Sequence, residues 1–374
     1  MATNKTDKVL NVPTLRFPGF TDEWRKCTIS QFGNIVTGNT PSTSDSENYI
    51  DEGYLWASPS DLNITKYVYD TKIHLSLKGY DKTRKLPKDA ILVTCIGSTI
   101  GKMGMSYTEI STNQQINAVV VNGLFDNDFV YYAIQSRFPK YLTSISIQAV
   151  PILSKSAFGE LENYYPSKIE QNKIGKLLSL LDERIALQSK LIDRLKSLMD
   201  GIVDKVTAQT PNITIGNCLD CYSSTLQEGE TEEQGTYPVY GANGVCGYLD
   251  YATISAPAIL IVKDGSGVGN VSYANGDCSV VGTLNYLQPK KDVSAKFLYF
   301  VLKRFNFQPY KTGMAIPHIY FKAYSKARIF CPDYEEQTRM AASLSRIEDK
   351  IALEERLLCL LQEQKHYLLS AMFI

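Results

Sequence analysis

Few residues of this 374-residue chain have the types and spacings that catalysis or metal binding needs. The chain has three histidines, His74, His318 and His366, and none lies in a Gly-x-Ser-x-Gly sequence or a His-x-x-x-His pair. Cys218 and Cys221 form a Cys-x-x-Cys pair, but no second pair or neighbouring histidine completes a zinc site. We therefore expect reduced structural thiols, no metal, and no catalytic triad.

Two glycine-rich segments match a phosphate-binding loop only in part. The segment Gly97–Lys102 is one residue short and lacks the Ser or Thr that should follow the lysine, and Gly265–Asn270 has no lysine. Each follows an apolar run, from Ile91 and from Ile259, that predicts a strand, so both segments predict tight turns. Asn163–Pro166 has the wrong order for the Asn/Asp-Pro-Pro-aromatic motif of a DNA methyltransferase. The sequence thus predicts a protein that is not an enzyme.

The chain contains an internal repeat. Residues 151–191 align without a gap with residues 317–357, at an offset of 317 − 151 = 166. The glycine segments align at a similar offset, 265 − 97 = 168. The identical pairs at the first offset are Pro151/Pro317, Ala157/Ala323, Pro166/Pro332, Glu170/Glu336, Gln171/Gln337, Ser179/Ser345, Ile185/Ile351, Ala186/Ala352, Leu187/Leu353 and Leu191/Leu357. The sequence therefore predicts two copies of one plan, a β-rich globule followed by a long helix.

Each predicted helix follows a proline, Pro166 or Pro332. Ser167 and Asp333 are the expected N-caps, each with a glutamate at the capping-box position three residues later. Each helix is predicted to have about 38 residues and thus a length of about 57 Å. Since the linker between Thr207 and Ile213 is short, we expect the two helices to pair antiparallel.

A stripe of apolar residues at alternating three- and four-residue spacing predicts a coiled-coil seam on each helix. The residues expected in the seam are Leu178, Leu181, Ile185, Ile192, Leu195, Leu344, Ile347, Ile351, Leu358 and Leu361, with polar breaks at Gln188 and Glu354. A second set lies off the seam and comprises Leu187, Leu191, Leu198, Leu353, Leu357 and Leu360. This set indicates either a surface for another subunit or a core that the chain satisfies by itself.

The formal net charge is zero, from 39 basic and 39 acidic residues, so only the local distribution of charge is informative. Residues 212–250 have six acidic and no basic residues, whereas residues 290–328 have nine basic residues and one acidic residue, a balance of 9 − 1 = +8. A basic segment with interleaved aromatic residues is typical of a phosphate-contacting face, although single lysines are more often plain solvated surface. The candidate DNA contacts are Lys78, Lys82, Arg84, Lys85, Lys102, Lys263, Lys303, Arg304, Lys311 and Lys322.

No apolar run has the roughly 18 residues that a membrane span needs. The chain begins Met1-Ala2-Thr3-Asn4-Lys5 and continues with mixed residues, without an apolar signal core. We therefore expect a cytoplasmic protein without a membrane partner.

The repeated pattern Pro-x-x-x-x-x-Ala-[Phe/Tyr] and then Pro-x-x-x-Glu-Gln at each helix start resembles the specificity subunit of Type I restriction–modification systems. The opening around Val12–Trp24 and the segment Thr37–Ser42 are similar to the start of the first target-recognition domain of that family. The resemblance covers essentially the whole chain. It implies an α+β fold of two β-rich target-recognition globules, separated by a pair of long antiparallel coiled-coil helices, with a pseudo-twofold internal repeat.

The expected domains are residues 1–166 for the N-terminal segment and first target-recognition domain, 167–207 for the central helix, 208–332 for the second target-recognition domain, and 333–374 for the C-terminal helix. The resemblance implies that each globule binds one half of a bipartite site in double-stranded DNA. With the helices as spacer, the half-sites would lie at most about 17 base pairs apart, at about 3.4 Å per base pair.

The resemblance also implies partners. Two modification subunits would use S-adenosylmethionine, and restriction subunits that act as endonuclease and translocase would use ATP and Mg²⁺, whereas this chain would have no cofactor of its own. The alternative is a two-domain coiled-coil scaffold that binds proteins and has no DNA specificity.

Overall fold

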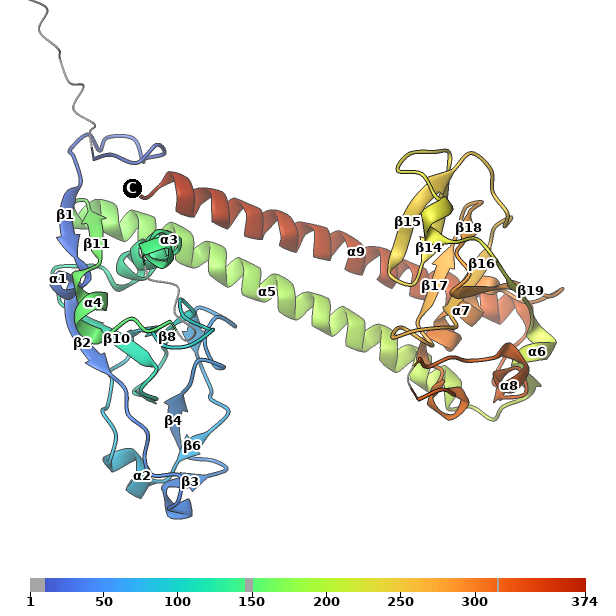
Figure 1. The fold of residues 1–374 in the computed structure, drawn as a ribbon, viewed down its shortest axis with the longest axis horizontal. Coiled ribbons are helices and arrows are strands. Elements are labelled where there is room, and N and C mark those ends of the chain that lie inside the picture. Colours follow the sequence, from blue (N-terminus) through green and yellow to red (C-terminus); the bar gives the residue numbers. More distant parts are fainter. Residues whose placement is uncertain (1–10, 145–150, 315) are drawn as a thin grey trace, which may run out of the picture. The chain divides into compact units, whose positions relative to one another are not determined.

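The computed structural model describes residues 11–144, 151–314 and 316–374 (Figure 1). The polar start of the chain lies outside these residues. The chain forms two compact units. Unit 1 is made of residues 1–189 and 356–374, and unit 2 is made of residues 190–355. Each unit has its own sheets and includes part of both long helices, so the expected α+β class is confirmed. Within the described residues, no helix combines the length and apolar character that a membrane crossing requires.

The globular part of unit 1 is built around a five-stranded sheet. Its strands, in spatial order, are β2 (Gly33–Thr37), β10 (Ile116–Val121), β7 (Ile91–Thr94), β8 (Met103–Ser106) and β5 (Tyr67–Val68). The smaller sheets contain β3 (Tyr49–Ile50), β6 (His74–Leu75), β4 (Tyr54–Ala57) and β9 (Ser111–Thr112), and β1 (Arg25–Thr28) with β11 (Glu162–Tyr165). The helices are α1 (Ile29–Phe32), α2 (Leu77–Asp81), α3 (Asn127–Ser144) and α4 (Lys155–Glu160), with a 3-10 turn at Ser46–Asn48. The apolar run of β7 is buried at all four residues because both faces of the sheet are covered: Ile91 and Val93 belong to one hydrophobic cluster and Leu92 to another.

The globular part of unit 2 has a four-stranded sheet at its centre. Its strands, in spatial order, are β13 (Leu219–Ser223), β19 (Leu284–Pro289), β16 (Ala258–Val262) and β17 (Val271–Ala274). A second sheet contains β15 (Gly244–Leu249), β14 (Tyr237–Gly241) and β18 (Ser279–Val280), and β12 (Ile213–Thr214) pairs with β20 (Arg328–Ile329). The helices are α6 (Ile215–Cys218), α7 (Ala295–Arg304) and α8 (Phe321–Tyr324), with 3-10 turns at Glu228–Glu230 and Gln308–Tyr310.

The two units repeat the same topology. The order β2-β10-β7-β8 in unit 1 corresponds to β13-β19-β16-β17 in unit 2, and every neighbouring pair in both series is antiparallel. The pairs β1-β11 and β12-β20 also correspond, since each joins the first strand of a unit to the strand that precedes its long helix. The internal repeat is therefore confirmed. The additional sheets differ, because β3-β6-β4-β9 is present in unit 1 and β15-β14-β18 in unit 2.

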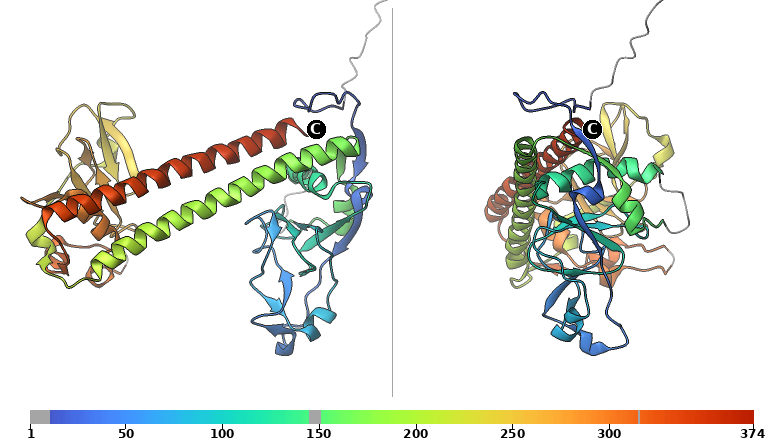
Figure 2. Two further views of the ribbon diagram at one scale, coloured as in Figure 1. Left: turned by 180° about the vertical axis from the view of Figure 1, so that it is seen from behind. Right: turned by 90° about the vertical axis from the view of Figure 1, so that its left-hand side faces the viewer.

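The two long helices are α5 (Lys168–Thr207, 40 residues) and α9 (Tyr334–Ala371, 38 residues). Within each unit the two helices lie side by side, which Figure 2 shows from two further directions. In unit 1, Lys365 Nζ lies 2.7 Å from Asp182 Oδ1. In unit 2, Lys196 Nζ lies 2.7 Å from Glu355 Oε1. Lys196 comes after Asp182 in α5, whereas its partner Glu355 comes before Lys365 in α9. The helices are therefore antiparallel, as expected.

The ten predicted seam residues are all buried or half-buried, and Leu178 is fully buried. The leucines off the seam are different. Leu187 is 66% exposed and Leu353, its repeat counterpart, is 65% exposed. Leu191, Leu198 and Leu360 are also exposed, whereas Leu357 is half-buried. The expected alternative of a core that covers these leucines within the chain is therefore wrong.

The starts of the two helices differ in their capping. Asp333 Oδ1 accepts a hydrogen bond from Glu336 N at 2.8 Å, so Asp333 is an N-cap as predicted. The expected capping role of Glu170 is wrong, because its carboxylate instead accepts two hydrogen bonds from Arg16, at 2.7 and 2.8 Å. Leu15 N, next to this arginine, donates to Ala371 O at 2.8 Å. The segment before β1 thus contacts the start of α5 and the end of α9.

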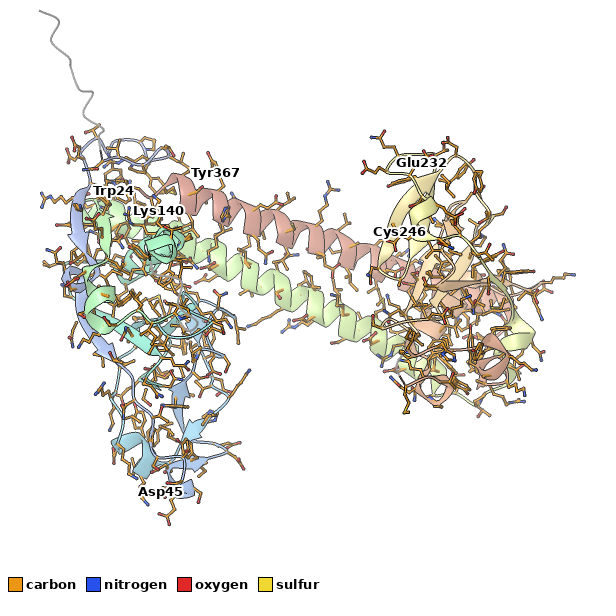
Figure 3. The ribbon with its side chains drawn as sticks, viewed as in Figure 1. Trp24, Asp45, Lys140, Glu232, Cys246 and Tyr367 are labelled. Carbon is orange, nitrogen blue, oxygen red and sulfur yellow. The ribbon has the colours of Figure 1, made fainter. Side chains whose placement is uncertain are left out.

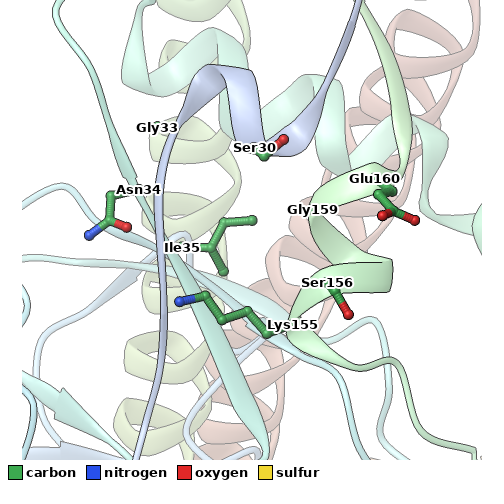
Figure 4. Close-up of a pocket in the computed structure, with 8 residues that line it drawn as sticks. All are labelled: Ser30, Gly33, Asn34, Ile35, Lys155, Ser156, Gly159 and Glu160. Carbon is green, nitrogen blue, oxygen red and sulfur yellow. The ribbon is translucent and has the colours of Figure 1, made fainter.

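Helix α4 packs closely against β2 beside a surface pocket (Figure 4). Ser154 is the N-cap of α4, and its hydroxyl accepts a hydrogen bond from Ala157 N. A Cβ atom at Gly159 would lie 3.1 Å from Ile35 Cδ1, so this close approach favours glycine. The contact holds the segment that precedes α4, which begins at Pro151, against the sheet.

Candidate nucleic-acid interface

The two glycine segments form tight turns with matching backbone geometry. Gly97 and Gly265 both have φ of +94°, and Gly101 and Gly269 both have φ of +91°, a region that favours glycine. In each turn the strand before it hydrogen-bonds the strand after it, through Gly101 N to Thr94 O and Gly269 N to Val262 O, both at 2.9 Å. The turns are backbone structures in which strands reverse, as the sequence predicts.

Each turn contacts the first of the two repeated prolines, Pro151 in unit 1 and Pro317 in unit 2. Gly97 N donates to Pro151 O and Gly265 N donates to Pro317 O, both at 3.0 Å. The residues after the prolines continue the pairing, since Ile319 N donates to Lys263 O at 2.9 Å. The repeated proline thus lies at the turn in both units, which explains its presence in both copies.

In unit 2 this pairing brings together basic residues that are far apart in the sequence. Lys263 lies beside Ile319, Lys311 precedes the pair of hydrogen bonds between Thr312 and His318, and Lys322 is in α8. No carboxylate of the described residues lies within ion-pair distance of Lys102, Lys263, Lys311 or Lys322. These lysines therefore keep charges that a phosphate can neutralise.

The same end of unit 2 exposes large apolar and aromatic side chains. Met314 is fully exposed, Ile316 is 67% exposed and Tyr320 is 60% exposed. The ring of His318 lies edge-on to Tyr320, with centroids 5.0 Å apart. Exposed apolar groups among lysines are suited to contacts with base edges or base steps, where phosphates and bases lie close together.

The acidic stretch of unit 2 lies elsewhere in the unit. Glu232, within residues 212–250, is on the side of β14 and β15, whereas α8 lies on the opposite side of the unit (Figures 1 and 3). The hydrogen bonds between Glu232 and Tyr248 backbones join this stretch to β15. The part of the acidic stretch around Glu232 thus lies away from α8, whereas Asp220 of the same stretch lies 3.4 Å from Lys290.

Two of the candidate DNA contacts in unit 2 contact the long helices instead. Arg304 donates to both carboxylate oxygens of Asp204 in α5, at 2.9 and 2.7 Å. Lys303 Nζ lies 3.5 Å from Glu348 in α9. These partly exposed ion pairs therefore join α7 to the long helices within unit 2.

The candidate contacts of unit 1 form a local network at the end of the unit marked by Asp45 in Figure 3. Lys78 and Lys82 each lie 3.2 Å from Asp45 Oδ2, and Lys85 lies 3.0 Å from Asp81. Arg84 Nη1 donates to Thr37 O at 2.6 Å. These groups are exposed, and exposed ion pairs contribute little stability, so a phosphate can replace them at small cost. The ten candidate contacts remain predictions.

The cysteine pair lies on two elements, Cys218 in α6 and Cys221 in β13, and within the described residues no group of three or more histidine, cysteine or acidic side chains could hold a metal ion. Cys218 is buried, and the neighbouring Cys331 thiol together with this burial raises the pKa of Cys218. All eight cysteines are free thiols. Cys218 and Cys331 thus pack together between α6 and the start of α9.

The sequence analysis missed the contacts that join each globule to its helix. Gln171 and Gln337, each 2% exposed, accept hydrogen bonds from Asp126 N and Ser294 N, at the starts of α3 and α7. Each also donates to the carbonyl oxygen of the proline before its helix. The signal was present, since these glutamines are an identical pair of the repeat, but a surface helix start does not by itself predict buried amides.

The duplicated globule-and-helix fold is matched twice by one family model. The model of the Type I restriction modification DNA specificity domain matches residues 21–197 and again residues 220–363. The chain belongs to this family. The two matched stretches correspond to the two copies of the repeat.

Curated relatives share parts of the sequence. The Type I restriction enzyme HindI specificity subunit of Haemophilus influenzae is 28% identical over 187 residues, which cover 47% of this chain and 40% of that protein. The MjaIX specificity subunit of Methanocaldococcus jannaschii is 29% identical over 174 residues, which cover 45% of this chain and 40% of that protein. The chain thus matches less than half the length of these two relatives. The EcoprrI specificity subunit of Escherichia coli is 19% identical over 86% of both chains.

Solved structures share the fold. The S subunit of a Type I restriction–modification system from M. genitalium superposes with a TM-score of 0.72 and 20% identity, over 97% of this chain and 99% of that chain. A subunit from a structure of a Type I restriction–modification assembly superposes with a TM-score of 0.52 and 15% identity, over 96% and 98% of the two chains.

Proposed function

We propose that this chain is the sequence-specific DNA-binding subunit of a Type I restriction–modification complex and that it catalyses no reaction itself. Each unit recognises one half of a bipartite site in double-stranded DNA. The observation that carries the proposal is the duplicated globule, in which each copy matches the DNA specificity domain and has a glycine turn beside a lysine without an ion pair to any described residue. Family membership and the basic face at α8 support this function.

The two half-sites differ in sequence. The shared sheet positions each globule, but the additional sheets of the two units are different in strand number and order. Since base contacts come from side chains and loops outside a common scaffold, different additional sheets favour different base sequences.

Modification subunits dock on the exposed leucines of the long helices. In unit 1 these include Leu187 on α5 and Leu360 on α9, and in unit 2 they include Leu198 on α5 and Leu353 on α9, each exposed by more than half. Exposed leucines that recur along a helix are typical of a protein interface. The modification subunits bind S-adenosylmethionine and transfer the methyl group, and restriction subunits add ATP- and Mg²⁺-dependent cleavage. The complex acts in the cytoplasm, where the chromosome lies.

The direct test is to sequence methylated bases in the genome of the host, with and without this gene. We expect a split motif, two short sequences separated by unspecified bases, that is methylated only when the gene is present. A continuous palindrome, or no change in methylation, would contradict the proposal. Failure of the chain with its modification subunit to retain any DNA from a random pool would favour the scaffold alternative.

The basic face can be tested separately by the salt dependence of DNA binding. Replacing Lys311 or Lys322 by glutamine should weaken binding to all sequences alike and lower the slope of log affinity against log salt by about 0.9 per lost phosphate contact. Lys291→Gln, at an exposed lysine before α7, is the matched control. An equal slope for all three variants would remove the α8 face from the proposal.

A further inference from the structure

In unit 1 a buried tyrosine joins the globular part to the long helices. Tyr132, in α3, is fully buried, and its hydroxyl donates to Asp182 Oδ2 of α5 at 2.7 Å. Two ammonium groups lie over its ring, Lys66 at 5.0 Å and Lys365 of α9 at 5.7 Å from the centroid. Lys365 also lies 2.7 Å from the second oxygen of Asp182. One carboxylate thus contacts the globule and both helices.

Lys66, one of the two lysines over the Tyr132 ring, is itself buried. The side chain of Lys66 is 5% exposed, and its ammonium contacts Asp128 of α3 at 2.5 Å and the hydroxyl of Ser179 in α5 at 2.6 Å. A buried lysine requires a carboxylate and further hydrogen bonds, and here one partner is in the globule and the other in the helix. Rotation of the globule on α5 would break this set of contacts.

Unit 2 has a similar arrangement that contacts one of the two long helices, α9. Tyr299, in α7, donates to Glu348 Oε1 of α9 at 2.6 Å. Lys296 and Lys303 lie over its ring, at 4.6 and 5.3 Å from the centroid. Lys296 also contacts Glu348 Oε2 at 2.8 Å. A buried tyrosine between two lysines again donates to a carboxylate of a long helix.

The two copies reach this arrangement with different residues. The carboxylates are repeat counterparts, since 348 − 182 = 166. Asp126 and Ser294 occupy equivalent positions at the starts of α3 and α7, at an offset of 294 − 126 = 168. At this offset the repeat counterpart of Tyr299 is Tyr131 and not Tyr132. The lysines come from different elements. The same type of contact, from a buried tyrosine to a carboxylate of a long helix, is thus present in both units although the tyrosines are not repeat counterparts.

The chemistry of the cluster favours a persistent contact. Burial and the neighbouring carboxylate raise the pKa of Tyr132, and burial and the hydrogen bond to Glu348 raise that of Tyr299, so both hydroxyls stay protonated and donate. Burial alone would raise the pKa of Glu348, but hydrogen bonds from Lys296 and Tyr299 lower it. Hydrogen bonds to charged groups are stronger than neutral ones.

We propose that Tyr132 and Tyr299 are positioning residues that hold each recognition globule at one angle on its helix, and that they thereby set how strictly the complex discriminates the spacing of its half-sites. The inference rests on the proposed DNA-recognition function. One extra base pair moves a half-site by about 3.4 Å along the duplex and turns it by about 35°. A globule that cannot rotate on its helix loses base contacts at the wrong spacing. Loss of the hydroxyl loosens this attachment, although the contacts of Gln171 and Gln337 remain, and lets the globule follow the displaced half-site more closely.

The test uses the complex of the full chain with its modification subunits, on DNA with the native spacing and with one base pair added or removed. Tyr132→Phe and Tyr299→Phe each remove one oxygen atom. The matched control is Tyr80→Phe, since Tyr80 of α2 is 2% exposed and donates to Glu109 inside the globular part of unit 1, without a contact to either long helix. Methylation rates on the three DNAs are the readout.

We expect the two variants to methylate the native spacing within about threefold of the unchanged protein but to lose about tenfold of their spacing discrimination, a factor that corresponds to 1.4 kcal/mol. Tyr80→Phe should keep its discrimination. Lys66→Met and Lys296→Met keep the tyrosine hydroxyl but remove a lysine from the cluster, and they should show the same loss of spacing discrimination. They replace a tyrosine variant that does not fold. The inference would be overturned if the Tyr132 and Tyr299 variants discriminated spacing as well as Tyr80→Phe does. It would also be overturned if their methylation rates fell equally on all three DNAs. Absence of sequence-specific methylation by the unchanged complex would instead refute the proposed function.

Discussion

Replacing Arg16 by methionine should destabilise unit 1 by about 3 kcal/mol, the lower end of the cost of breaking a buried ion pair. The Arg16 guanidinium donates two hydrogen bonds to Glu170, and the side chains are 13% and 1% exposed. Without Arg16, the Glu170 carboxylate stays buried without its partner. The magnitude is at the lower end because Arg16 retains some contact with solvent.

Calorimetric unfolding of the full chain measures this effect. A loss of about 3 kcal/mol corresponds to a decrease of about 6–12 °C in the unfolding temperature of a unit of this size. Arg184→Met is the control, because Arg184 is an exposed residue of the same helix, and it should change stability by less than about 0.5 kcal/mol.

A double variant separates the lost ion pair from lost packing. Arg16→Met combined with Glu170→Met replaces both charges by apolar groups, and should recover more than half of the loss because no buried charge remains. A single Arg16→Met variant within about 1 kcal/mol of the unchanged protein, or a double variant less stable than the single one, would refute this reasoning.

Four further variants test other contacts. Gln337→Ala should cost unit 2 about 2–4 kcal/mol, measured by urea unfolding, because it leaves two backbone groups at helix starts without partners; a loss under about 1 kcal/mol would mean that water replaces the amide. Leu178→Ala, at a fully buried seam position, should cost about 2–5 kcal/mol, whereas Leu187→Ala at an exposed position should leave stability unchanged and weaken co-purification of the modification subunit; equal stability losses would contradict the assigned burial. Since the folded pKa of Glu348 is lowered, its ionisation stabilises unit 2 above the usual glutamate pKa of about 4.3 and this contribution is lost as pH falls. Glu348→Gln should therefore flatten the acid side of the stability profile of unit 2, and an unchanged profile would contradict this.

The repeat made most of the fold predictable. Two prolines, an Ile-Ala-Leu triplet and a Glu-Gln pair at a constant offset are local patterns, so they indicate helix starts and seams without knowledge of the partner. The family model matches the same two stretches. The capping prediction was correct at Asp333 and wrong at Glu170, because Arg16, which lies 154 residues earlier in the chain, occupies that carboxylate.

Counting charges along the sequence identified the basic segments but not which of their side chains form ion pairs. Lys303 and Arg304 belong to the same basic segment as Lys311 and Lys322, and only the folded chain shows that the first two contact Glu348 and Asp204. Lys303 and Arg304 are at the end of α7, which contacts the long helices, whereas Lys311 follows a 3-10 turn and Lys322 is in α8.

The sequence alone determined the duplication, the two long helices and their antiparallel pairing, because each follows from residue spacing or linker length along one chain. Tertiary structure alone decided which leucines remain exposed, which lysines keep free charge, and that Tyr132 and Tyr299 contact carboxylates of the long helices. The reason is physical. Periodicity describes one element at a time, whereas burial and ion pairing depend on residues that only folding brings within a few ångströms.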